Sequence, residues 1–159
     1  MAASPLFDLD ELDLTQVAVS SQRVGEINPQ AGHMRQLDHL IWITDDFSYA
    51  LGVKHVRDDE FWVPGHVPGR PLLPGVLMIE AAAQLCSLTE RLRPEMDAEM
   101  FIGFIRCDDV VFRGQVVPGD TLYLLAKQIS FRRRQFVSST QAMVDGRLVF
   151  EATITGMIL

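Results

Sequence analysis

The sequence is poor in cysteine, and its cysteines follow no metal-binding or redox pattern. Cys86 and Cys107 are the only two in 159 residues, and neither has a second cysteine or a histidine at ligand spacing. Two isolated thiols suit a reducing compartment. The N-terminal segment MAASPLFDLDELDL also lacks the basic region and apolar run of a secretory signal. We therefore expect a cytoplasmic protein.

Long hydrophobic runs and an excess of basic residues are absent as well. No stretch of about 18 apolar residues occurs, so no membrane insertion is expected. The formal net charge is −7, which argues against a dedicated nucleic-acid-binding protein. Hydrophobic residues make up 48% and charged residues 22% of the chain, which is an ordinary globular composition. A chain of this length can bury the core of one domain.

The first half of the chain contains candidate strands, a rigid loop and one long helix. Residues 1–30 are acidic and weakly patterned, which predicts an N-terminal arm or a short helix before a single domain over residues 31–159. Two strands are expected at 39–44 and 47–56, with the two aspartates between them in a turn. A stretch rich in Pro and Gly follows, and a helix is expected at 74–92, ended by Pro94.

After the helix the hydrophobic pattern changes to the period of two that is typical of strands. Four strands are expected at 100–112, 121–132, 135–144 and from 147 to the C-terminus. Asp145-Gly146 is a two-residue hairpin signal between the last two strands. The order of elements predicts an α+β fold in which a largely antiparallel sheet is covered by the one long helix.

The expected helix is apolar on nearly every side, yet it carries Glu80 and Gln84 four residues apart on one face. A helix that is apolar all round is normally buried. Burial removes water from a carboxylate and favours its protonated form, which makes Glu80 a candidate general acid. The alternative is that Glu80 lies at the rim of the core and reaches water.

The start of this helix and the loop before it offer two further candidate groups. The first N–H groups of a helix lack intrahelical partners, and Gly75 would let a substrate oxygen approach them. Alternatively, Gly75 only makes a tight turn. His66 lies in a loop stiffened by four prolines, which suits a histidine with a fixed orientation, although a lone loop histidine is commonly a surface residue.

The stretch GHVPGRPLLPGVLMIEAAAQL (65–85) resembles the signature of the β-hydroxyacyl-acyl carrier protein dehydratases of fatty-acid synthesis. A second segment, VVFRGQVVPGDTLYL (110–124), and the later FRRR and VDGRLVFEATI resemble that family's last strands and hairpins. The resemblance covers roughly residues 39–159. Two features differ from the family: Val67 follows the histidine in place of the usual Phe, and residues before 56 keep little of the family's early segment.

This resemblance implies the hot-dog fold, in which a long central helix is wrapped by a curved antiparallel sheet. It implies a homodimer, alone or as a trimer of dimers, with active sites at the subunit interface. His66 from one subunit would be the base and Glu80 from the other the acid, with the Gly75 N–H binding the substrate carbonyl and the Val76 carbonyl orienting the imidazole. The reaction would convert a (3R)-3-hydroxyacyl thioester into the trans-2-enoyl thioester, with no metal or other cofactor.

The expected substrate is carried by acyl carrier protein or by CoA. Acyl carrier protein is acidic, and the basic cluster of Arg132, Arg133 and Arg134 at an expected hairpin tip could contact it, or could be a solvated turn. Two alternative functions remain at this point. One is a hot-dog acyl-thioesterase, and the other is a catalytically silent hot-dog protein that binds acyl chains.

Overall fold

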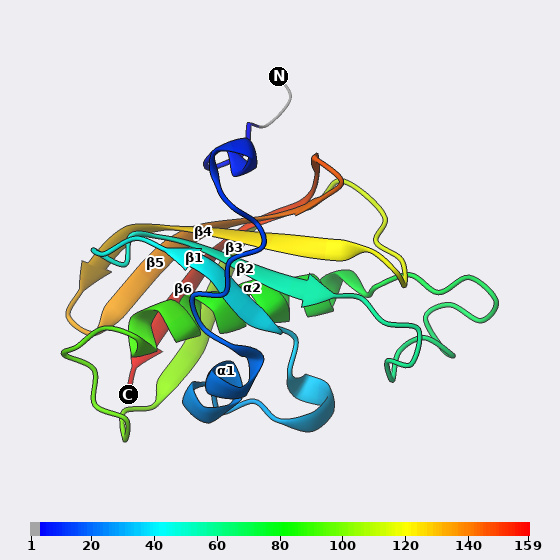
Figure 1. The fold of residues 1–159 in the computed structure, drawn as a ribbon. Helices are drawn as coiled ribbons and strands as arrows, with labels where there is room; N and C mark the ends of the chain where they lie inside the picture. The colour runs from blue at the N-terminus through cyan, green and yellow to red at the C-terminus, as the bar shows by residue number, and fades with distance from the viewer. Residues whose placement is uncertain (1–3) are drawn as a thin grey trace.

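A six-stranded antiparallel sheet curves around one long helix in the computed structural model, which describes residues 4–159 (Figure 1). The strand order in the sheet is β1-β2-β4-β5-β6-β3. The elements are α1 (Ser21–Ile27), β1 (His39–Ile43), β2 (Tyr49–His55), α2 (Gly75–Arg91), β3 (Ile102–Phe112), β4 (Thr121–Arg132), β5 (Gln135–Val144) and β6 (Arg147–Ile158), with short 3-10 turns at Leu9–Glu11 and Gly32–Met34. Within residues 4–159 no helix has both the length and the apolarity needed to cross a membrane.

The α+β fold expected from the sequence is confirmed, and the boundaries of the long helix and six strands agree to within about two residues. The hairpin between β5 and β6 turns at Asp145 and Gly146, both at positive φ, as the two-residue signal predicts. Strand β2 begins at Tyr49 because the residues before it form a turn. In that turn the Asp46 carboxylate accepts hydrogen bonds from the hydroxyl and backbone N–H of Ser48.

Helix α2 fills the concave side of the sheet and supplies much of the core. Its buried residues include Ala81, Ala82, Leu85 and Leu88, and the two alanines let the sheet approach closely. Most of this helix is buried, as expected from its apolar sequence, but one side of its first half is not. A stripe at helical spacing, made of Val76, Ile79, Glu80 and Ala83, stays partly or fully accessible.

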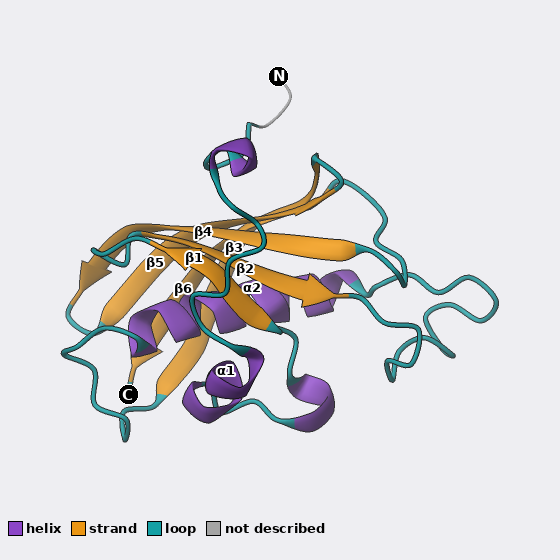
Figure 2. Ribbon diagram, in the orientation of Figure 1, coloured by secondary structure: helices purple, strands orange, loops and turns teal. Residues whose placement is uncertain are grey.

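The N-terminal segment packs on the opposite, outer face of the sheet, which the sequence did not indicate. A second apolar cluster there is formed by Ile41, Leu51, Val53, Leu125 and Met143, with side chains of the N-terminal segment packed against it. Among these, the Phe7 ring lies 5.4 Å from the Trp42 ring. The chain then crosses the sheet to reach α1 on the α2 side (Figure 2). Within residues 1–30, where an arm or a short helix was expected, the chain forms the 3-10 turn at Leu9–Glu11 and then the short helix α1.

Strand β3 forms one edge of the sheet and presents apolar side chains to solvent. Phe104, Ile105, Val111 and Phe112 are all exposed, and Phe112 packs on the start of α2. An apolar edge strand is a surface on which another strand can pair.

Both cysteines are free, and burial raises the pKa of Cys86 to about 12.

Candidate active site

His66 lies on the exposed loop between β2 and α2 and is bound there through both its backbone and its ring. Its N–H donates to the Trp62 carbonyl at 2.8 Å, and its carbonyl accepts from the Leu72 N–H at 2.8 Å. The ring nitrogen Nδ1 lies 2.7 Å from the Leu72 carbonyl oxygen. Because a carbonyl oxygen only accepts, Nδ1 carries the proton in this contact. The lone pair of Nε2 is then available to accept a proton.

A buried ion pair attaches this loop to the sheet. Lys54 of β2 and Glu60 of the loop are both nearly inaccessible, with Lys54 Nζ 3.0 Å from Glu60 Oε2. The Trp62 indole N–H also donates to Glu60 Oε2 at 2.9 Å, and the Arg57 backbone N–H donates to Oε1 at 3.0 Å. Burial raises the pKa of Glu60, but these hydrogen bonds and Lys54 outweigh it and hold that pKa below its ordinary value. Trp62 therefore connects the ion pair directly to the backbone of His66.

Glu80 lies in the second turn of α2, and Gln84 one turn later fixes the position of its carboxylate. Gln84 Nε2 donates to Glu80 Oε1 at 2.8 Å and to the Met34 carbonyl at 2.6 Å. Gln84 Oε1 accepts from the backbone N–H groups of Gln36 at 2.8 Å and Leu37 at 3.2 Å. This fully satisfied amide holds the Glu80 carboxylate in one orientation and leaves its second oxygen, Oε2, outside the contact.

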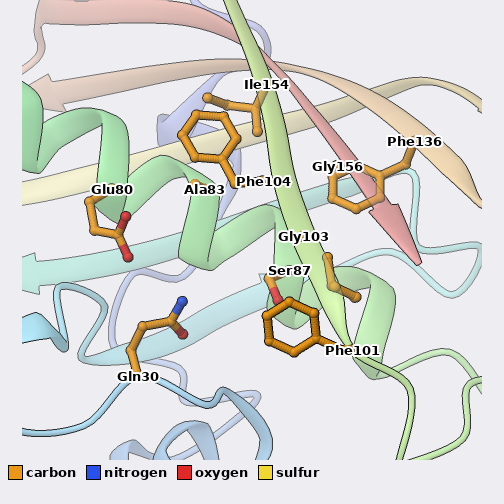
Figure 3. A pocket seen from close by; sticks show the side chains of 11 residues that line it. Gln30, Glu80, Ala83, Ser87, Phe101, Gly103, Phe104, Phe136, Ile154 and Gly156 are labelled. Atoms are coloured by element: carbon orange, nitrogen blue, oxygen red, sulfur yellow. The ribbon is translucent and has the colours of Figure 1, made fainter. Parts of the chain in front are cut away.

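Glu80 lines a pocket of about 360 Å³ between α2 and strands β3, β5 and β6. Gln30 and Glu80 lie at one end of the pocket, and Phe101 and Phe136 lie at the other (Figure 3). The full lining consists of Gln30, Glu80, Ala83, Ser87, Phe101, Ile102, Gly103, Phe104, Phe136, Ile154 and Gly156. The combination of apolar walls with a few polar groups at one end suits a ligand with a polar head and an apolar chain.

The far end of the pocket is shaped by Gly156 and Phe136 on neighbouring strands. A Cβ atom added at Gly156 would lie 2.2 Å from the Phe136 ring, so no side chain other than hydrogen fits there. The absence of a side chain at Gly156 lets the tip of the Phe136 ring approach β6, and the ring forms the end wall (Figure 3). The depth of the pocket therefore depends on this pair.

Gly75 is the first residue of α2, and the absence of a side chain there makes room for Phe112 of β3. A Cβ atom there would lie 2.7 Å from a ring carbon of Phe112, so glycine permits Phe112 to cover the start of the helix. Binding of the substrate carbonyl by the Gly75 N–H stays a prediction. The Val76 side chain is 68% exposed. Within the chain the His66 imidazole bonds to the Leu72 carbonyl, so its contact with the Val76 carbonyl also stays a prediction.

One chain does not bring the two predicted catalytic residues into a shared pocket. Within the described chain, His66 is not part of the pocket that Glu80 lines. Gln30 and Ser87 do line it, and neither was predicted from the sequence. Ser87 lies seven residues after Glu80 on the same helix face, a spacing that could have identified it. No sequence pattern marks Gln30, because its position depends on how residues 28–36 fold back onto α2.

The basic cluster Arg132–Arg134 forms the exposed turn between β4 and β5. The Arg134 carbonyl accepts from the Ile158 N–H, and Ile158 pairs with Ile102, so this turn lies near the start of β3. A contact with a carrier protein stays a prediction. Among residues 4–159 no group of three or more His, Cys, Asp or Glu side chains is arranged to hold a metal ion.

A long helix wrapped by an antiparallel sheet defines the hot-dog class of fold, and the loop histidine and the pocket glutamate are the residues that the dehydratase resemblance leads us to expect. A family model described as FabA-like domain matches residues 28–153, and the chain belongs to this family.

Curated relatives agree with this assignment, and solved structures share the fold. The chain is 34% identical over 142 residues to the 3-hydroxyacyl-[acyl-carrier-protein] dehydratase FabZ of Lactococcus lactis subsp. cremoris (strain SK11), covering 89% of this chain and 96% of that protein. The FabZ of L. lactis subsp. lactis (strain IL1403) matches with the same identity and coverage. In structure, the dehydratase heterocomplex ApeI:P from Xenorhabdus doucetiae matches with a TM-score of 0.72 and 17% identity, covering 86% of this chain and 90% of that one.

A thioesterase shares the fold as well. A mutant of the thioesterase PA1618 from Pseudomonas aeruginosa matches with a TM-score of 0.67 and 15% identity, over 92% of this chain and 99% of that one. At such low identity the structural matches establish the hot-dog fold alone, and the family assignment rests on the sequence matches.

Proposed function

We propose that this protein is a 3-hydroxyacyl-[acyl-carrier-protein] dehydratase of fatty-acid biosynthesis. The observation that carries the proposal is that a member of the FabA-like family holds each of the two predicted catalytic groups in a fixed orientation. His66 has its proton fixed on Nδ1, and Glu80 is oriented by Gln84 at the polar end of an apolar pocket. The similarity to FabZ over most of both chains supports the same reaction.

The proposed reaction removes water from a (3R)-3-hydroxyacyl thioester. Nε2 of His66 takes the C2 proton, and the electron pair left on C2 forms the C2–C3 double bond of the trans-2-enoyl product. The Gly75 N–H donates to the thioester oxygen, where negative charge develops. The C3–O bond breaks as Glu80 gives its proton to the hydroxyl, which leaves as water. These steps need only side-chain and backbone groups of the protein.

We further propose that the working site forms across a two-fold homodimer. The exposed apolar edge of β3, together with Val76, offers a self-complementary surface for a second copy. Two β3 strands paired antiparallel would place the end of one strand beside the start of the other. The start of β3 lines the pocket. Phe112, at the end of β3, covers the first residue of α2, and the His66 loop leads into that residue. The loop of a second copy would therefore approach the Glu80 pocket.

In this dimer the turn of Arg132–Arg134 would lie close to the active site. The turn of Arg132–Arg134 lies near the start of β3, where the second copy's loop would approach. We propose that it contacts the acidic acyl carrier protein while the acyl chain enters the pocket, with charge attraction speeding the encounter. A cytoplasmic location is proposed as well, since both thiols are free and suit a reducing compartment.

The proposal is tested by incubating the full chain with (3R)-3-hydroxybutyryl thioesters of acyl carrier protein and of CoA. We expect enoyl thioester to form, detected by its ultraviolet absorbance, without release of free thiol. Thiol release without enoyl product would replace the dehydratase by a thioesterase. Binding of acyl thioesters with no turnover in either direction would instead make it a silent acyl-binding protein.

A further inference from the structure

The N-terminal strap, residues 4–14, lies on the outer face of the sheet, on the side away from α2 (Figure 1). It packs on the outer cluster, which consists of Ile41, Leu51, Val53, Leu125 and Met143. The strap residues that make this contact are all apolar: Leu6, Phe7, Leu9, Leu12 and Leu14. Between them stand four exposed carboxylates and no basic side chain: Asp8, Asp10, Glu11 and Asp13. The strap therefore replaces an apolar surface by an acidic one.

Specific contacts fix the strap to the sheet at its N-terminal end. The side chain of Gln141 on β5 is buried, and its Oε1 accepts a hydrogen bond from the Leu6 N–H at 2.7 Å. The Nε2 of the same amide donates to the Ser4 carbonyl at 3.0 Å. Next to these bonds, the Phe7 ring packs 5.4 Å from the Trp42 ring of β1. An amide that bonds the strap backbone at two points holds it in one register, so the strap is part of the folded domain.

Without the strap, the outer cluster would be an apolar sheet surface facing water. Each of its five residues is 6% exposed or less, and they lie on the neighbouring strands β1, β2, β4 and β5, so they form one continuous patch. An apolar sheet face is buried well against a second sheet at a spacing of about 10 Å. A second copy of the chain offers the same face, and a two-fold axis makes two such faces self-complementary. The bare face would therefore favour association of copies.

We propose that the strap prevents the outer face from associating with the same face of a second copy. Its apolar side chains occupy the position that a second sheet would take. Its four carboxylates add repulsion, because two copies brought face to face would present the same negative charge to each other. The strap lies outside residues 28–153, which the family model matches, whereas the whole outer cluster lies within them. The apolar side chains of β3 stay exposed, so the strap leaves the dimer interface proposed above open.

The experiment detaches the strap in the full-length chain by replacing Phe7, Leu9 and Leu12 together by serine. These substitutions remove apolar contacts with the outer cluster and keep all four carboxylates. We expect the molar mass, measured by light scattering after size exclusion, to at least double relative to the wild type, because the bare faces associate. Adding Leu125→Lys to this variant places a charge on the bare face, and the mass should return to the wild-type value.

Val17→Ser serves as the matched control, because Val17 is an apolar residue close to the strap but is 56% exposed. It should keep the wild-type mass. A wild-type mass for the triple-serine variant would overturn the inference. A larger mass that persists after Leu125→Lys would also overturn it, because the association would then arise from another surface or from unfolding. Because the test is a ratio of masses, it holds for any number of copies in the wild-type assembly and does not depend on the proposed function.

Discussion

The amide of Gln84 bonds to the Glu80 carboxylate at 2.8 Å and to three backbone groups of residues 34–37. The same side chain thus anchors the segment before β1 and orients the proposed acid. A carboxylate held this way loses little freedom when substrate binds, which favours catalysis by a positioned group. Substitution of Glu80 should leave the segment before β1 in place, since Gln84 keeps its hydrogen bonds to the backbone of residues 34–37.

Glu80→Gln should therefore separate catalysis from folding. Gln has a similar volume but no carboxyl proton, so we expect turnover to fall by at least about 10²-fold, the scale for a positioned acid or base. His66→Ala should fall comparably, and the double variant should not lose the product of both factors, because the two groups act in one step. Steady-state kinetics measure the effect, and a thermal melt checks that folding is retained. Near-normal turnover of Glu80→Gln would contradict the mechanism.

Mixing variant subunits tests whether the site is shared between two copies. A heterodimer of a His66→Ala chain and a Glu80→Gln chain contains one intact site if each site takes one residue from each chain. Random reassociation should restore about a quarter of wild-type activity, because half of the dimers are mixed and each has one good site of two. The control is either variant reassociated with itself, which should stay inactive. If the mixture stays as inactive as its parents, the site lies within one chain.

The buried Lys54–Glu60 pair should be the main support of the His66 loop. Glu60→Gln leaves the Lys54 charge buried without a counter-charge, and Lys54→Met leaves the Glu60 charge unpaired; each should cost about 3–5 kcal/mol of unfolding free energy. The double variant should cost less than the sum of the two. Chemical denaturation of the four proteins measures these values, and additive losses would show that the pair does not couple.

The pH dependence of stability gives an independent measure of the same pair. The folded-state pKa of Glu60 lies below its ordinary value of 4.5, so its stabilising effect is present above that pH. It is lost as the pH falls through the lower, folded-state pKa. The wild type should accordingly lose stability more steeply than the Lys54→Met/Glu60→Gln double variant below about pH 4.5. Equal slopes would mean that Glu60 titrates normally in the folded protein.

The sequence predicted the elements well wherever local pattern decides structure. The long helix, its proline boundary and the Asp145-Gly146 turn depend on residues close in sequence, and each was found. His66 and Glu80 were predicted as the catalytic pair from a motif with fixed spacing, and that assignment stays a prediction. By contrast, the packing of Phe7 on Trp42 and the placement of Gln30 depend on contacts between distant segments. No local periodicity encodes such contacts, so the cover of the outer sheet face was missed.

The accessible stripe on α2 is a second feature that the sequence pattern alone could not predict. An apolar helix indicates burial but does not say whether the burying surface belongs to the same chain. Val76 is exposed in one chain although its residue type suits a core. A second copy provides that missing surface in the dimer proposed above, and the sequence pattern then reflects the assembly and not the single chain.

Ser87 should set how long an acyl chain the pocket accepts. It lies two turns after Glu80, about 10 Å along the helix axis at 1.5 Å per residue, between the polar end and the Phe136 wall. Ser87→Leu places a bulky side chain across this path, and Leu suits a helix. Overfilling such a space costs about 1–3 kcal/mol, so long-chain substrates should lose about fivefold to about 150-fold in kcat/KM. Chains that end before Ser87 should be little affected.

Ser87→Ala is the matched control, because it removes the hydroxyl without filling the pocket. It should keep activity with both short and long chains, since an apolar chain gains nothing from the hydroxyl. The measurement is kcat/KM over a ladder of (3R)-3-hydroxyacyl thioesters of increasing length, with thermal melts of each protein. An equal loss at every length in Ser87→Leu would mean that the helix or the catalytic end is disturbed. No loss at any length would place the acyl chain elsewhere, and the pocket beside Glu80 would then not be the acyl site.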